Sequence, residues 1–175
     1  MDKQYFHNKD DKFGWLETSS DVVQREMKAY KKLAEIEGIK LPQTIEVSGE
    51  DYPMLTGKDG GEAKKAQSGY FVEHLEFGRT FKPKMMTLGV PKAIVNTYKN
   101  LPTDEAKAQM RGDLKAIQDK LGGISDVVGE LTLATNPRTG AVYILDVGPN
   151  SSGDVGGGPA KSAHKGLDKI LEACK

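Results

Sequence analysis

The sequence predicts an α+β fold in a single domain, and three observations support that prediction. The chain has 175 residues, which is the size of one ordinary domain. Apolar residues recur at helical spacing in several segments and alternate in short runs elsewhere. Helical and extended segments also follow one another along the chain in mixed order. We therefore expect one domain over residues 1–175.

The composition excludes several classes of protein. Lys and Arg number 25 and Asp and Glu number 25, so the formal net charge is zero. Binding to nucleic acid or to an anionic membrane normally needs a basic excess. No apolar run reaches the about 20 residues of a membrane span, and residues 1–10 lack the apolar segment of a cleaved secretion signal. Cys174 is the single cysteine, which excludes an intramolecular disulfide and a zinc site with two thiolates. We expect a soluble protein with no nucleic-acid partner.

The first half of the chain predicts three strands and a helix. Residues 1–12 are polar, and we expect no regular structure there. A helix is expected after Asp21, since Gln24 completes a capping pattern and Gly38 provides a stop. Its apolar stripe has steps of four, three and four: Val23, Met27, Tyr30 and Ala34. The expected strands cover residues 13–16, 44–47 and 70–75, with a polar loop over 57–69.

The second half predicts a long helix, a hairpin and a final helix. Thr103 is expected to cap the long helix, which ends at Gly122 and Gly123. Its apolar stripe contains Ala106, Met110, Leu114, Ile117 and Leu121. The hairpin pairs residues 131–134 with 141–145 through a turn over 136–140, which contains Pro and Gly. The glycine-rich residues 153–158 predict no element, and the last helix carries Leu167, Ile170 and Leu171.

Asp146 is the most informative single residue for function. It ends the apolar run Tyr143 to Leu145, and Gly148 then allows the backbone to turn away sharply. A carboxylate in this position is suited to hold Mg²⁺, which takes one or two carboxylates together with phosphate oxygens. The alternative is that Asp146 only caps a turn.

The order of the elements resembles the protein kinase-like fold over roughly residues 13–148. Gln24 to Tyr30 is similar to the helix whose glutamate, here Glu26, pairs with a phosphate-binding lysine. Tyr70 to Phe81, YFVEHLEFGRTF, resembles the last N-lobe strand and the hinge. Ile124 to Gly148, ISDVVGELTLATNPRTGAVYILDVG, resembles the catalytic loop, a hairpin and the Asp-Phe-Gly motif, with Val147 in place of Phe.

This resemblance implies a minimal bilobal fold, with a reduced N-lobe sheet over 13–76 and a truncated helical C-lobe over 77–175. It implies that ATP and Mg²⁺ are bound and that a γ-phosphoryl group is transferred to a protein hydroxyl. Asp126 is then the catalytic base, and Asp146 is the catalytic metal ligand that Glu130 assists. The residues implied for cofactor binding are Glu26, Glu73, His74 and Leu75.

Three departures from the kinase pattern keep other functions open. No Gly-x-Gly-x-x-Gly loop precedes the first strand, and the His-Arg-Asp signature is missing. The phosphate-binding lysine is also missing, because Glu17 stands in the best register and Lys12 is only a substitute from the start of the strand. A catalytically degenerate pseudokinase that binds a protein partner is therefore one alternative. A small α+β domain unrelated to kinases is the other.

The short C-terminal part points to a particular kind of kinase. Only 29 residues follow Asp146, whereas a full C-lobe adds several helices. The chain thus resembles the smallest kinases, which are secreted bacterial effectors acting in virulence. The resemblance implies a host protein as substrate, such as a heat-shock chaperone, and secretion into the host cytosol. A cytoplasmic role in the producing cell is the alternative.

Overall fold

A computed structural model describes most of the chain. It covers residues 3–7, 13–17, 20–48, 56–57, 68–72, 76–125, 127–128, 130–145 and 158–175, and describes side chains within 27–43, 76–125, 127–128, 130–145 and 161–175. The chain divides into two compact units. The first comprises Met1–Tyr30 and Pro42–Leu75, and the second comprises Lys31–Leu41 and Glu76–Lys175.

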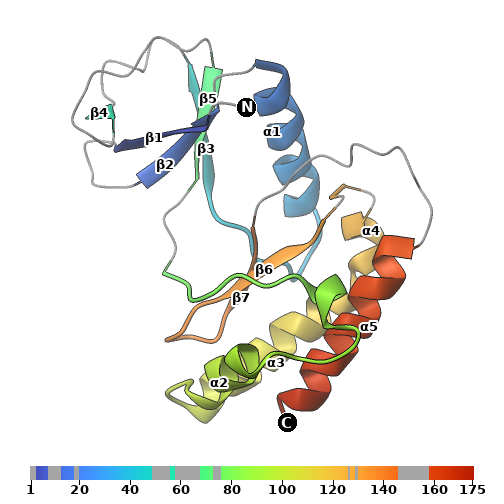
Figure 1. Ribbon diagram of the computed structural model, residues 1–175. Helices are drawn as coiled ribbons and strands as arrows, with labels where there is room; N and C mark the ends of the chain where they lie inside the picture. Colours follow the sequence, from blue (N-terminus) through green and yellow to red (C-terminus); the bar gives the residue numbers. More distant parts are fainter. Residues whose placement is uncertain are drawn as a thin grey trace. The chain divides into compact units, whose positions relative to one another are not determined.

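The first unit contains two small antiparallel sheets and most of one helix. Its elements are β1 (Lys3–His7), β2 (Phe13–Glu17), α1 (Ser20–Ala34), β3 (Thr44–Ser48), β4 (Thr56–Gly57) and β5 (Ser68–Val72). One sheet has the order β2-β1-β4, and the other pairs β3 with β5 (Figure 1). The β3–β5 register runs from Thr44 opposite Val72 to Ser48 opposite Ser68.

Strands expected near residues 13, 44 and 70 are confirmed as β2, β3 and β5. The expectation that residues 1–12 lack regular structure is wrong, because residues 3–7 form β1. Tyr5 pairs with Trp15 at the centre of the antiparallel β1–β2 register. Pairing with a neighbouring strand satisfies backbone N–H and C=O groups, and it outweighs a polar composition.

Helix α1 lies where the sequence places it, but one residue of its buried stripe differs. Met27 and Tyr30 are buried as expected, whereas Ala34 is exposed and the neighbouring Leu33 is fully buried. Val23, the first residue of the predicted stripe, lies outside the residues whose side chains are described. A step of three from Tyr30 is as compatible with a period of 3.6 as a step of four, and the larger side chain occupies the core. Gly38 follows the helix with φ +84°, which a side chain would disfavour.

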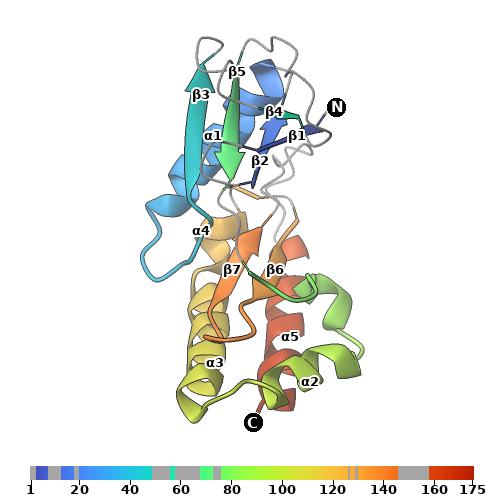
Figure 2. The same cartoon turned by 90° about the vertical axis from the view of Figure 1, so that its left-hand side faces the viewer.

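The second unit packs helices around one hairpin. Its elements are the 3₁₀ helix η2 (Pro83–Met86), α2 (Lys92–Lys99), α3 (Asp104–Asp119), α4 (Leu121–Ser125), β6 (Thr132–Thr135), β7 (Val142–Leu145) and α5 (Gly158–Ala173). Figures 1 and 2 show α3 and α5 running side by side, with α2 against both. η2 packs on α5, and β7 packs on α3.

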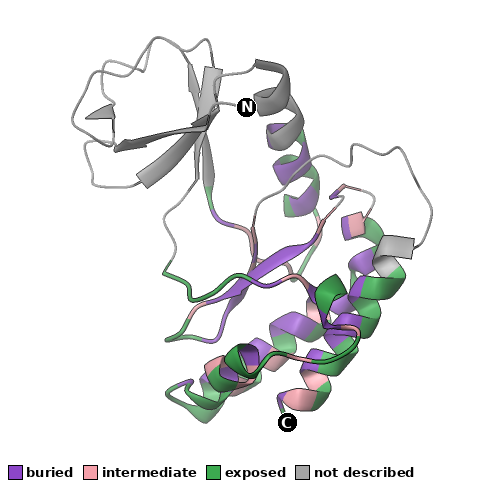
Figure 3. Ribbon diagram, in the orientation of Figure 1, coloured by how far each residue is buried: buried purple, intermediate pink, exposed green. Residues whose placement is uncertain are grey.

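The core of the second unit lies between α3, α5 and the hairpin (Figure 3). The side chains that are at most 1 % exposed include Met110, Leu114, Ile117, Leu133, Ile144, Leu167 and Ile170. The stripe predicted for the long helix is therefore confirmed, and its last residue, Leu121, is buried in α4. Two polar residues of α3, Asp113 and Gln118, are also buried. Asp113 contacts the hairpin, and Gln118 bonds to His164 and Asp168 of α5.

The ends of α3 show one confirmed signal and one correction. Thr103 Oγ1 accepts a hydrogen bond of 3.1 Å from the Ala106 N–H, as expected of an N-cap. Gly122 and Gly123 do not stop the helical path, because both lie inside α4. Leu121 and Ile124 are buried on either side of them, so packing outweighs the low helix propensity of glycine.

The sequence also carried a signal for α2 that the prediction did not use. Pro91 precedes the first turn, and Ile94 and Tyr98 are buried four residues apart. Proline at the start of a helix and an i,i+4 apolar pair are both typical helix signals. A helix could therefore have been expected over 92–99.

The β6–β7 hairpin is held at both edges. The hairpin predicted from the sequence is confirmed, and its register pairs Thr132 with Leu145 and Thr135 with Val142. On the β6 edge, Leu133 and Phe81 exchange two backbone hydrogen bonds of 2.8 and 2.9 Å. On the β7 edge, the Ile144 N–H donates to the Lys40 carbonyl at 3.0 Å. Both edges of this two-stranded sheet are thus covered by neighbouring chain segments.

These elements confirm a mixed helix and strand architecture of the α+β class. The finer prediction of a kinase-like fold stays a prediction, as does the division at residues 76 and 77. In the part of the chain described above, no helix combines the length and the apolar character that crossing a bilayer demands.

Candidate functional site

Most of the predicted site residues lie outside the described residues. This holds for Glu73, His74, Leu75, Asp126 and Asp146. Glu26 lies in α1, and its side chain is not described. The structure therefore places one predicted site side chain, that of Glu130, together with the segments on either side of Asp126 and the strand before Asp146.

The hairpin register brings two of these segments together. Glu130 stands two residues before Thr132, whose strand partner is Leu145. Asp146 is the next residue after Leu145 in the chain. Directly opposed Cα atoms of antiparallel strands are about 4.5–5.5 Å apart. The end of the loop that contains Asp126 and Glu130 thus meets the end of the strand that leads into Asp146.

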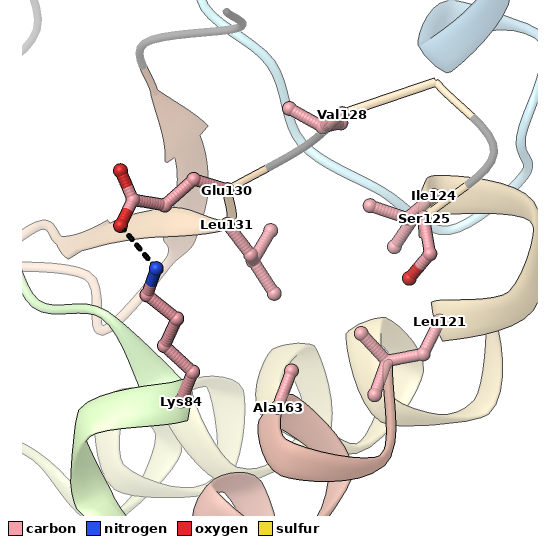
Figure 4. Close-up of a pocket in the computed structure, with 8 residues that line it drawn as sticks. All are labelled: Lys84, Leu121, Ile124, Ser125, Val128, Glu130, Leu131 and Ala163. Carbon is pink, nitrogen blue, oxygen red and sulfur yellow. Dashed lines mark ion pairs between the residues drawn. The ribbon is translucent and has the colours of Figure 1, made fainter. Parts of the chain in front are cut away.

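A small pocket lies beside this end of the hairpin (Figure 4). It has room for water but not for a nucleotide. Four elements or connections supply its lining: η2, α4, the loop after α4, and α5. The lining residues are Lys84, Leu121, Ile124, Ser125, Val128, Glu130, Leu131 and Ala163. Figure 4 shows the Lys84–Glu130 pair on one side and the Ser125 hydroxyl on the other.

Glu130, which lines the pocket, forms ion pairs with two lysines. Lys84 Nζ lies 2.6 Å from its Oε1, and Lys82 Nζ lies 3.0 Å from its Oε2. All three side chains are between 41 and 44 % exposed. Such ion pairs exchange readily with water and contribute little to folding stability. We call Lys82, Lys84 and Glu130 the Glu130 cluster.

The Glu130 cluster carries an excess of positive charge. The hydrogen bond from Lys84, and then the one from Lys82, lowers the pKa of the Glu130 carboxyl below its ordinary value. Glu130 is therefore ionised at neutral pH, and one of the two ammonium charges is left uncompensated. A phosphate oxygen is the kind of group that such a charge attracts.

Close packing on α5 fixes the segment that carries both lysines. A Cβ at Gly166 would lie 1.7 Å from the Pro83 carbonyl oxygen, so the two backbones touch at this position. Pro83 stands between Lys82 and Lys84 in the chain. The backbone from which the two lysines extend is thus anchored, whereas their side chains are half exposed.

Glu130 is the described residue that could help to hold a metal ion. A carboxylate is a proper ligand for Mg²⁺. Each of its oxygens already contacts an ammonium group, so one lysine must turn away before a metal binds there. Among the described residues, no three or more His, Cys, Asp or Glu side chains gather in a way that could bind a metal.

Lys82 and Lys84 were not among the site residues predicted from the sequence. They are 46 to 48 residues from Glu130 in the chain, and only the folded structure brings the three together. The pattern Lys-Pro-Lys is a local signal of two charges on a stiff segment, but it does not indicate their partner.

Comparisons with known protein families, with curated proteins and with solved structures found no match to this chain.

Proposed function

We propose that this protein is a minimal kinase-like phosphotransferase, which transfers the γ-phosphoryl group of ATP to a hydroxyl group of a protein. The observation that carries the proposal is the β6–β7 register. It joins the end of the loop with Asp126 and Glu130 to the strand that leads into Asp146. A loop carboxylate, a short hairpin and a second carboxylate in that order support a site for phosphoryl transfer.

The Glu130 cluster supports the proposal because it supplies a positive charge in a chain that has no lysine at the kinase position for phosphate binding. The strand before α1 has Glu17 in the register where a kinase has its phosphate-binding lysine. Lys82 and Lys84 enter from a different element, η2 and the residue before it, and carry one net charge beside Glu130. We assign to them the role of attracting the phosphate oxygens of ATP.

The residues proposed to hold Mg²⁺ are Asp146 and, once a lysine has turned away, Glu130. Both are carboxylates, which suit this ion. The bound ion would supply charge neutralisation at the phosphates. The proposed roles of Glu26 and of the backbone over Glu73 to Leu75 are to position the phosphates and the adenine.

The proposed reaction is an in-line displacement at the γ-phosphorus. The hydroxyl oxygen of the protein substrate attacks phosphorus and forms the new O–P bond. The bond from phosphorus to the bridging β–γ oxygen breaks, and its electron pair leaves with ADP. The hydroxyl proton passes to the carboxylate of Asp126. Positioning and electrostatic stabilisation supply most of the acceleration in such chemistry.

The test is calorimetric titration of ATP into the protein with and without Mg²⁺. We expect binding to the wild type that needs Mg²⁺ and a loss of at least tenfold in affinity for Asp146→Asn. The matched control is Asp119→Asn, an exposed carboxylate that pairs with Lys115 on the surface of α3. Equal affinity in all three proteins, or no Mg²⁺-dependent binding to the wild type, would reject the proposal.

A partner-binding pseudokinase is the second candidate, and one observation favours it. Both oxygens of Glu130 are occupied by ammonium groups, so this carboxylate is not free for a metal until a contact breaks. A pseudokinase would bind its protein partner without Mg²⁺ and transfer no phosphoryl group. Incubation of the wild type with ATP labelled at the γ-phosphate and a heat-inactivated host-cell extract distinguishes the two, because the kinases of the extract are then inactive and only the phosphotransferase labels a protein.

A further inference from the structure

Asp113 is a buried carboxylate that no part of the proposed reaction uses. It lies on the buried face of α3 and is 6 % exposed. Burial of a charged side chain is costly unless partners compensate for the lost water. Its surroundings therefore require an explanation.

Three donors from three segments compensate for the burial of Asp113. Oδ1 accepts hydrogen bonds of 2.7 Å from Lys40 Nζ and of 2.7 Å from Gln109 Nε2. Oδ2 accepts a hydrogen bond of 2.9 Å from the backbone N–H of Val142. Gln109 belongs to the same helix, Lys40 follows α1, and Val142 is the first residue of β7.

Lys40 contacts β7 a second time through its backbone. Its carbonyl oxygen accepts the Ile144 N–H at 3.0 Å, and Lys40 forms a parallel bridge with Tyr143. Val142 and Ile144 are two residues apart, so their N–H groups face the same edge of the strand. Asp113 and Lys40 together satisfy both donors of this edge.

On the opposite edge, the hydrogen bonds between β6 and the described segment 78–81 join backbone atoms. Leu133 and Phe81 exchange two of them, and the Gly78 N–H donates to the Thr135 carbonyl at 3.2 Å. On the β7 edge, in contrast, the side chain of Asp113 accepts one of the backbone hydrogen bonds. A residue without a side-chain acceptor at position 113 would leave the Val142 N–H without a partner from α3.

We infer that Asp113 is a positioning residue, which together with Lys40 sets the place of β7, the strand after which Asp146 follows directly in the chain. This inference rests on the proposed function, in which Asp146 holds the metal. An apolar residue of similar size could pack in the same helix face without the cost of burying a charge. The carboxylate of Asp113 is explained by its hydrogen bond to the Val142 N–H, which holds the edge of β7 in place.

The test measures Mg²⁺-dependent ATP affinity together with thermal unfolding. Asp113→Asn keeps the size of the side chain but removes its charge and one acceptor. Because partners that orient a metal ligand typically change affinity 10- to 100-fold, we expect a loss in that range. Lys40 is 37 % exposed at its side chain, so Lys40→Gln is the milder variant and serves if Asp113→Asn does not fold. Lys40→Arg keeps the charge and should bind ATP like the wild type.

Each outcome decides between a positioning role, a structural role and no phosphotransferase at all. Weaker binding by Asp113→Asn and Lys40→Gln, with Asp119→Asn and Lys40→Arg unchanged, supports the inference. A lower unfolding temperature with unchanged ATP affinity would show a structural role only and overturn it. Absence of Mg²⁺-dependent binding to the wild type would overturn the proposed function, and this inference with it.

Discussion

Two carboxylates of the second unit bind lysine in opposite settings. The Asp113 side chain is 9 % exposed, and it meets Lys40 within a packed face of α3. The Glu130 side chain is 44 % exposed, and it meets Lys82 and Lys84 at the surface. The two ion pairs have nearly the same closest distance, 2.7 Å for Lys40–Asp113 and 2.6 Å for Lys84–Glu130.

The difference in burial determines what each carboxylate can do. Loss of one partner from a buried pair leaves a charge that water cannot reach, so the pair fixes the segments it joins. Loss of one partner from an exposed pair is compensated by water, so the pair can open and take another ligand. Asp113 is therefore suited to position a strand, and the Glu130 cluster is suited to contact an incoming anion.

The largest expected effect is that of Asp113→Ala on stability. The change leaves the buried Val142 N–H without its acceptor and removes the partner of Lys40, whose side chain is part-exposed, and we expect the free energy of unfolding to fall by about 3 kcal/mol. Urea denaturation measures it. Asp119→Ala is the matched control on the same helix, where an exposed pair with Lys115 should be worth less than about 1 kcal/mol. Equal losses in both variants would contradict the comparison.

A second prediction concerns the backbone contact that anchors the Glu130 cluster. Gly166→Ala places a Cβ 1.7 Å from the Pro83 carbonyl oxygen, which backbone atoms can relieve only by moving apart. We expect a loss of about 1–3 kcal/mol in the free energy of unfolding, larger than the gain in helix propensity. Thermal unfolding measures this loss.

The control for this glycine should change stability in the opposite direction. Gly112 is exposed in the middle of α3, and a Cβ there meets nothing within 4 Å. Gly112→Ala should therefore stabilise the protein by about 0.5–1 kcal/mol, because alanine has the higher helix propensity. A stabilising Gly166→Ala would show that α5 and η2 are not in close contact.

The sequence predicts the burial of Asp113, but it does not predict the partners of Asp113 or of Glu130, because these partners lie far away in the chain. Asp113 is three residues after Met110 and four before Ile117, so helical spacing alone puts it on the predicted apolar face. A charged residue on the apolar face of a helix indicates a buried charge that is paired with another group. Its partners Lys40 and Val142 come from other elements and could not be read from the spacing.

The same limit applies to the rest of the fold. The helix cap at Thr103 and the hairpin turn are local, and the sequence predicts both. Asn136 Oδ1 accepts from the N–H groups of Arg138 and Thr139, and Gly140 has φ +74°, as such a turn requires. β1 depends on pairing with β2, and the helical conformation of Gly122 in α4 depends on packing. Predictions from the local sequence were wrong for both.

The smallest expected effect is that of Lys84→Met on Glu130, and its pH dependence distinguishes an exposed pair from a buried one. Lys84 is the first cause of the lowered pKa of Glu130, so its loss should move that pKa back toward the ordinary value. A carboxyl whose pKa is lowered by folding stabilises the protein above its unfolded-state pKa. That stabilisation is lost as the pH falls through the folded-state pKa.

Wild type and Lys84→Met should therefore differ in stability by less than about 1 kcal/mol at neutral pH, and the difference should vanish in acid. NMR titration of the Glu130 carboxyl carbon measures the pKa directly, with Lys92→Met, an exposed lysine at the start of α2, as the control. High salt should reduce the shift, because exposed charges are screened. An unchanged Glu130 titration in Lys84→Met would mean that the pair does not form in solution. The ammonium group of Lys84, which is proposed to attract the phosphate oxygens, would then not be held beside the hairpin.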